Sequence, residues 1–181
     1  MPTDTRPILV FDVNETLLDI STLTPLFSRL FNDGSILREW FAQLVLYSQT
    51  LTLSGLYTPF GEIGVGALRM VADIHGVEIA DADIDELKTR MGKMPAYADV
   101  VPALTLLKEA GFRLVTLTNS ESSESPPPLE KAGLSEFLSA HFILRRCVSL
   151  NPHLRLTIWS PRHCPCPHPS CVWSLAICGT R

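Results

Sequence analysis

Three polar side chains directly follow two apolar runs, and their types suit nucleophilic hydrolysis. Asp12 follows the run Ile8–Phe11, while Thr118 and Asn119 follow the run Arg113–Leu117. A carboxylate can attack an electrophilic carbon or phosphorus and form an ester or acyl phosphate that water then opens. A hydroxyl and an amide can donate hydrogen bonds to charge that develops on oxygen. Asp12 is therefore a candidate nucleophile, and Thr118 and Asn119 are candidates for groups that orient a substrate.

We predict that a parallel α/β sheet positions these side chains. Apolar runs without alternation are typical of strands buried on both faces, and the sites of such sheets lie beyond the carboxyl ends of the strands. Asp99 and Gly111 bracket a predicted helix that leads into the second strand. Taken alone, Asp12 is more typical of a helix N-cap or a turn, and Thr118 and Asn119 are as typical of a polar turn as of a site. Their predicted meeting at one sheet edge favours the functional interpretation.

The segment 20–95 between the two strands is predicted to be helical almost throughout. Apolar residues recur there at helical spacing on about four faces, whereas a crossover between parallel strands needs one helix. We expect an inserted helical cap that covers the catalytic loop. Most of its aromatic residues suit the cap core, but a cap must also present some of them to the cleft. The predicted substrate-binding residues are Asn14, Glu15, Trp40, Phe41 and Tyr47.

Composition narrows the class of protein. The chain has 181 residues, of which 46% are hydrophobic and 19% charged, which excludes a disordered, collagen-like or coiled-coil protein. No apolar run reaches the roughly 18 residues of a membrane-spanning helix, and the first residues lack a signal-peptide layout. The net charge of −4 gives no reason to propose nucleic acid as a partner. We expect a cytoplasmic globular protein that does not bind membranes.

The composition changes abruptly near residue 143. Residues 1–142 carry a net charge of −9, whereas residues 143–181 carry +5, no acid, no lysine and all five cysteines. We predict an α/β core over 1–19 and 96–142, the helical cap over 20–95, and an atypical tail over 143–181. A shifted reading frame or an alternative terminal exon would each explain such a tail, and the sheet would then be incomplete at its C-terminal side. The segment Cys164–Cys171 invites a zinc interpretation, but it lacks a well-spaced Cys-x-x-Cys pair, and we predict no metal site.

Two motifs carry a resemblance to a known family. The segment Phe11–Leu17, a helical insertion, and then Leu117–Ser120 resemble the haloacid dehalogenase superfamily, closest to its L-2-haloacid dehalogenase (type II) branch, over about residues 6–142. Leu129–Leu134 also resembles the helix that follows the second motif. The resemblance implies a doubly wound, Rossmann-like parallel sheet with a cap, and Asp12 as nucleophile. It also implies a small anionic 2-haloacid as substrate, no cofactor and, as an open option, a homodimer.

The chain departs from the family pattern at several places. Phosphatases of the superfamily carry an aspartate two residues after the nucleophile and use Mg²⁺, but this chain has Asn14 there. Type II dehalogenases carry an arginine after the cap tryptophan, where this chain has Phe41. No lysine follows Lys131 and no acid follows Glu136, so the family's later lysine and acidic motif are missing. We expect an impaired 2-haloacid dehalogenase. The alternatives are a phosphatase, or an inactive truncated protein that serves as a binding module.

Overall fold

The sheet is parallel and brings the ends of its strands to one edge. The computed structural model describes residues 6–56, 58–118 and 127–143. The sheet within this part has the order β1 (Ile8–Phe11), β2 (Arg113–Thr118) and β3 (Ala140–Ile143), and both pairs are parallel. Both predicted strands and the α/β class are thereby confirmed. Of the predicted tail, only Ile143 belongs to the described residues.

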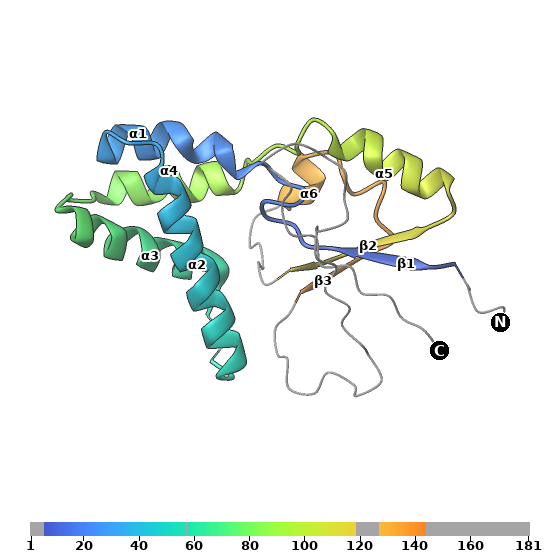
Figure 1. The fold of residues 1–181 in the computed structure, drawn as a ribbon, viewed down its shortest axis with the longest axis horizontal. Helices are drawn as coiled ribbons and strands as arrows, with labels where there is room; N and C mark the ends of the chain where they lie inside the picture. The colour runs from blue at the N-terminus through green and yellow to red at the C-terminus, as the bar shows by residue number, and fades with distance from the viewer. Residues whose placement is uncertain (1–5, 57, 119–126, 144–181) are drawn as a thin grey trace.

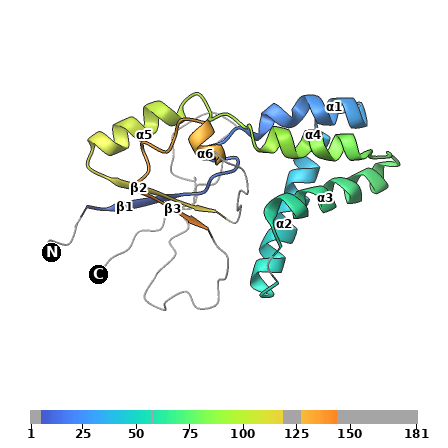
Figure 2. The same cartoon turned by 180° about the vertical axis from the view of Figure 1, so that it is seen from behind.

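Two helices border the sheet on the same side, as Figures 1 and 2 show. The first, α5 (Val100–Glu109), has Asp99 at its N-cap position, as predicted. Gly111 adopts a φ of 87° between α5 and β2, a backbone conformation that costs glycine little, so the chain can reverse there. The second, α6 (Pro128–Lys131), begins with a proline, which suits the first position of a helix.

The predicted helical segment contains four α-helices, as expected from its apolar spacing. They lie together beyond the end of β1 and form the cap (Figure 1). Gly76 ends the third helix with a φ of 65°, as a left-handed C-cap. The helices of the cap, with a short 3₁₀ turn η1 (Ile20–Leu23) ahead of them, are α1 (Thr24–Phe31), α2 (Ile36–Leu53), α3 (Phe60–His75) and α4 (Asp81–Met91).

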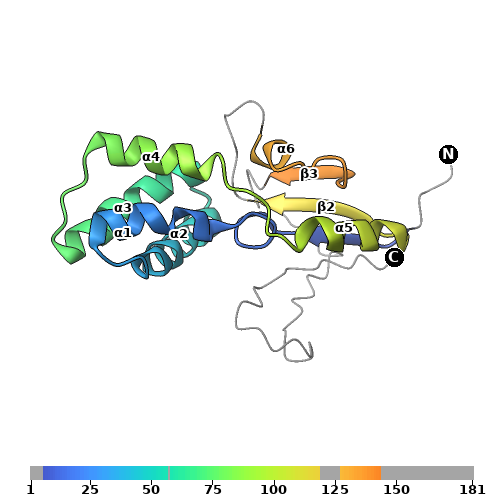
Figure 3. The ribbon, with the colours of Figure 1, turned by 90° about the horizontal axis from the view of Figure 1, so that it is seen from above.

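The chain passes between sheet and cap twice, and the two connecting segments are hydrogen-bonded to each other (Figure 3). The backbone N–H of Asp19 donates to the carbonyl of Pro95 at 2.8 Å, and the N–H of Tyr97 donates to the carbonyl of Leu17 at 3.1 Å. An antiparallel bridge between Leu18 and Ala96 lies between these bonds. This pairing joins the cap to the end of the sheet at one narrow place.

Trp40 lies at the centre of the cap core. Its side chain is fully buried, and its indole Nε1 donates a hydrogen bond of 2.8 Å to the carbonyl of Gly64 on α3. Its ring lies 5.2 Å from the ring of Phe27 on α1, measured between centroids. Because Trp40 contacts both neighbours, it joins α1, α2 and α3 through one side chain.

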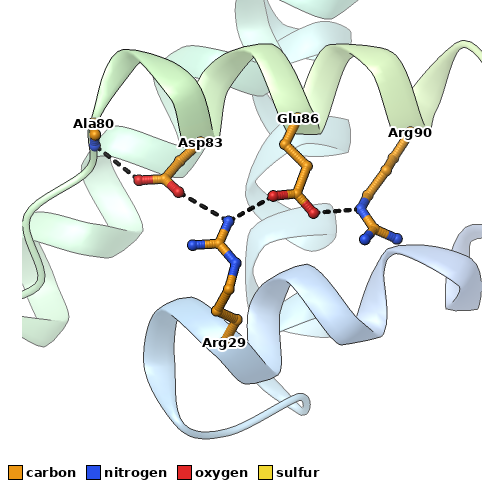
Figure 4. Close-up of polar contacts among 5 residues, drawn as sticks. All are labelled: Arg29, Ala80, Asp83, Glu86 and Arg90. Carbon is orange, nitrogen blue, oxygen red and sulfur yellow. Dashed lines mark hydrogen bonds and ion pairs between the residues drawn. The ribbon is translucent and has the colours of Figure 1, made fainter.

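Charged side chains join α1 to α4 on the outside of the cap (Figure 4). Arg29 Nη2 lies 2.9 Å from a carboxylate oxygen of Asp83 and 2.7 Å from one of Glu86. Arg90 Nε binds the other oxygen of Glu86 at 2.7 Å. Asp83 also accepts a 2.9 Å hydrogen bond from the backbone N–H of Ala80, the N-cap residue of α4. Asp83 therefore lies in the first turn of α4 and caps the helix from there.

Candidate active site

Asp12 follows the last residue of β1, at the edge where the sheet meets the cap. Burial raises the pKa of its carboxyl group from 3.8 to about 6, although a backbone hydrogen bond from Val13 partly opposes the shift. Desolvation has this effect because it disfavours the charged form. The carboxyl group is still mainly ionised at pH 7, as a nucleophile requires.

The loop after Asp12 is closed by its own backbone. The N–H groups of Leu17 and Leu18 donate to the carbonyl of Val13 at 2.9 and 3.0 Å. Glu15 adopts a φ of 60°, which is uncommon for a residue other than glycine. Its carboxylate forms an ion pair with Arg38, from the first turn of α2. The ion pair connects the nucleophile loop to the cap and holds Glu15 in this conformation.

A cavity of about 750 Å³ lies between the core and the cap. The nucleophile loop, β2, α6 and β3 form one wall, and the start of α3 and the end of α4 form the other. Lining residues include Val13, Asn14, Thr118, Leu129, Leu138 and His141 from the core, and Phe60, Glu62, Lys88, Met91, Gly92 and Met94 from the cap.

The structure brings only some of the predicted site residues to this cavity. Asn14 and Thr118 line it. Asp12 itself is not among the described lining residues, but Val13 and Asn14, which follow it directly in the chain, are. Asn119 lies outside the described residues. Asn14 and Thr118 thus share one opening, and the meeting of Asp12 with Thr118 and Asn119 stays a prediction.

The predicted aromatic substrate-binding residues lie elsewhere in the cap. Trp40 is in its core, and Phe41 packs against that core with its ring 6.3 Å from the Trp40 ring. Tyr47 is 42% exposed, and its hydroxyl lies 3.6 Å from the Met70 sulfur. The structure does not bring these three side chains, or Glu15, to the described cavity lining. The apolar residues of α2 that are buried, Leu37, Trp40 and Leu44, belong to the hydrophobic core.

Residues that the sequence analysis did not select line the cap side of the cavity. Lys88, Met91 and Gly92 lie three and four positions apart on α4, so they share one face of the helix. Glu62 lies in the first turn of α3. The helical spacing of residues 88, 91 and 92 was a usable signal, but a lysine at such a position is typical of a solvent-facing surface.

A histidine on β3 adds a neutral polar group to the core wall. Nδ1 of His141 is hydrogen-bonded to the hydroxyl of Thr116, which is fully buried on β2. Burial lowers the pKa of His141, so its ring is neutral at pH 7. Lys88 and Glu62 therefore provide the charges among the described lining residues.

The described residues contain no group of three or more His, Cys, Asp or Glu side chains placed to hold a metal ion. The cysteine-rich segment considered for zinc lies outside them. In the same part of the chain, no helix combines the length and apolar character needed to cross a membrane.

Comparisons with known proteins agree with this geometry. Residues 7–155 match the model of the haloacid dehalogenase-like hydrolases. The chain is 29% identical over 150 residues to (S)-2-haloacid dehalogenase 1 of Pseudomonas sp. (strain CBS-3), covering 78% of this chain and 61% of that protein. It is 29% identical over 146 residues to phosphoglycolate phosphatase of Agrobacterium fabrum (strain C58 / ATCC 33970), covering 74% and 57%.

A solved structure shows the same fold. The L-2-haloacid dehalogenase of Xanthobacter autotrophicus superposes with a TM-score of 0.66 at 22% identity, over 76% of this chain and 57% of that one. The chain thus spans about three-fifths of the length of these relatives. The family match extends into residues 143–155, beyond the compositional boundary in the sequence. With a parallel sheet, an inserted helical cap and an aspartate at the end of the first strand, this chain belongs to the haloacid dehalogenase-like hydrolase family.

Proposed function

We propose that this chain is a hydrolase that uses Asp12 to displace halide from small 2-haloacids. One observation carries the proposal: a half-buried, ionisable aspartate ends β1 next to a cavity that the cap closes from the other side. The similarity to (S)-2-haloacid dehalogenases supports the choice of substrate.

The chemistry needs two steps. A carboxylate oxygen of Asp12 attacks the carbon that bears the halogen, and the halide leaves with the bonding electrons to give an ester. Water then attacks the ester carbonyl, which releases a 2-hydroxy acid and restores the Asp12 carboxylate. A proton and a halide ion are the remaining products. Thr118 lines the cavity from the neighbouring strand, and its hydroxyl can donate a hydrogen bond to the oxygen that becomes negative.

A phosphatase is the second candidate, because the chain also resembles phosphoglycolate phosphatase of Agrobacterium fabrum. Such an enzyme would need a general acid two residues after the nucleophile, but Asn14 exchanges no proton near neutral pH. It would also need carboxylates to hold Mg²⁺. The donor set does not fit, since no acid follows Glu136 and the described residues gather no metal-binding group.

Alkylation of Asp12 tests the proposal in a single turnover. After incubation with (S)-2-chloropropionate, we expect mass spectrometry to find a carboxyethyl ester on the peptide that contains Asp12. Asp12→Asn should abolish the modification, because an amide is a far poorer nucleophile. Asp99→Asn is the matched control, since Asp99 is the exposed N-cap residue of α5, its side chain forms no capping hydrogen bond, and it is outside the described cavity lining.

Two results would contradict the proposal. One is a wild-type protein in which Asp12 stays unmodified, and the other is halide release that persists unchanged in the amide variant. Release of phosphate from p-nitrophenyl phosphate with Mg²⁺, dependent on Asp12, would instead favour the phosphatase.

A further inference from the structure

The substrate of the proposed reaction is an anion, and it must enter a site that already holds negative groups. Asp12 must be ionised to react, and Glu62 also lines the cavity. Two negative charges about 4 Å apart repel by about 4 kcal/mol at an effective dielectric constant of 20. Binding of a carboxylate therefore requires a cation in the cavity wall.

Two other basic side chains near the site already have partners. Arg38, at the start of α2, is paired with Glu15. Lys131 on α6 lies 3.3 Å from the carbonyl of Gly92. Lys88 is the one lysine or arginine among the described residues that line the cavity.

The position of Lys88 on α4 places it at the wall of the cavity, where it can contact a ligand. Leu87 is fully buried in the hydrophobic core. Lys88 is the next residue along α4 and is exposed, but it shares the cavity-lining face with Met91 and Gly92. A lysine can lay its methylene groups along such an apolar face while its ammonium group stays in contact with water or a polar ligand. Thr118 and Asn14 line the opposite side of the cavity.

The rest of the cavity wall is largely apolar. Met91, Met94 and Phe60 contribute from the cap, and Leu129 and Leu138 from the core. A volume of about 750 Å³ falls within the range of roughly 300–1,000 Å³ of pockets that hold drug-sized ligands. A three-carbon acid would leave much of this apolar surface in contact with water.

We propose that Lys88 binds the carboxylate of the substrate, and that the apolar wall accepts a substituent larger than the methyl group of 2-chloropropionate. This inference rests on the proposed function, because it names the substrate class of the same site. Glu62 also lines the cavity, so we expect its negative charge to lower the affinity for anions.

Calorimetry on the 181-residue chain carrying Asp12→Asn tests the proposal without turnover. We expect 2-chlorohexanoate to bind more tightly than 2-chloropropionate. Lys88→Met should weaken the binding of 2-chlorohexanoate about tenfold or more, and Lys88→Arg should restore most of it. Glu62→Gln should strengthen binding. Lys93→Met is the matched control, because Lys93 is exposed and lines a separate surface groove with Thr22 and Asp85. Circular dichroism confirms that each variant is folded.

The inference is overturned if Lys88→Met binds 2-chlorohexanoate as tightly as the Asp12→Asn parent, or if 2-chloropropionate binds as tightly as the longer acid. Failure of the proposed function gives a different result. In that case the Asp12→Asn protein binds the acid through Lys88, but the wild-type protein neither forms an ester on Asp12 nor releases halide.

Discussion

Asp12 combines two requirements that act against each other. A nucleophilic carboxylate must be charged, but the burial that removes competing water makes the charged form harder to reach. The backbone N–H of Val13 supplies part of the compensation. The resulting pKa of about 6 keeps the group mainly ionised at pH 7 while it remains more basic than a carboxylate in water.

This pKa predicts how the stability of the fold depends on pH. Because the pKa of Asp12 rises from 3.8 to about 6 on folding, the folded state binds this proton more tightly than the unfolded state. The contribution to stability is complete below pH 4 and is lost as the pH rises through 6. A shift of about two units corresponds to roughly 3 kcal/mol. We therefore compare the free energies of unfolding in urea of the wild type and Asp12→Asn at pH 4 and pH 7. Relative to the wild type, the free energy of unfolding of the amide variant should be higher at pH 7 than at pH 4 by up to that amount. A difference that does not vary with pH would contradict the prediction.

The packing of α2 against α3 depends on one large side chain. Replacing Trp40 with Phe removes the indole N–H that binds the Gly64 carbonyl and leaves a gap beside Phe27. We expect a loss of about 1–3 kcal/mol in the free energy of unfolding. Far-UV circular dichroism in urea measures it. Tyr47→Phe provides the comparison: its hydroxyl is on an exposed side chain near Met70, so its loss should cost less than about 0.5 kcal/mol.

The ion pairs between α1 and α4 should contribute less, despite their short distances. Burial is slight at this surface, and the pKa of Glu86 is lowered mainly by its hydrogen bond from Arg90 and then by Arg29. Exposed ion pairs contribute about 0–1 kcal/mol and are screened by salt. Glu86→Gln should therefore lower the free energy of unfolding by less than about 1 kcal/mol, and the difference should shrink at high salt. A larger loss that persists in salt would show that the network supports the packing of α4.

At the scale of the whole molecule, the charge of the site predicts slow turnover. In the family that the chain resembles, a later lysine steadies the charge of the nucleophile, but no lysine follows Lys131 here. Lys88 is proposed to bind the substrate carboxylate, so the charge of Asp12 itself still lacks the lysine of the family. A repulsion of about 4 kcal/mol that stays uncompensated at the nucleophile corresponds to roughly three orders of magnitude in rate. We therefore expect steady-state halide release from (S)-2-chloropropionate far below 1 per second, even though Asp12 is alkylated. Turnover within the common enzyme range of about 1–10³ per second would show that another cation, from the cap or the tail, takes the place of the lysine.

Local signals in the sequence predicted the elements and the place of the nucleophile. The runs Ile8–Phe11 and Arg113–Leu117 are unbroken and apolar, so they indicate buried parallel strands, and Asp12 ends the first. Gly111 marked the end of the predicted helix before β2, and its φ of 87° is one that suits glycine. These features depend on near neighbours in the chain, which is why they could be read without the fold.

Only the tertiary structure decided which side chains reach the cavity. Helical spacing shows that Trp40 and Leu44 share a face, but it does not tell whether that face meets another helix or a substrate. The packing of α1 and α3 against α2 turned Trp40 into the cap core, while the end of α4 brought Lys88 to the cavity. The ion pair of Arg38 with Glu15 joins residues 23 positions apart in the chain. Such contacts depend on how helices and sheet meet in space, and the periodicity of a single segment carries no information about its neighbour.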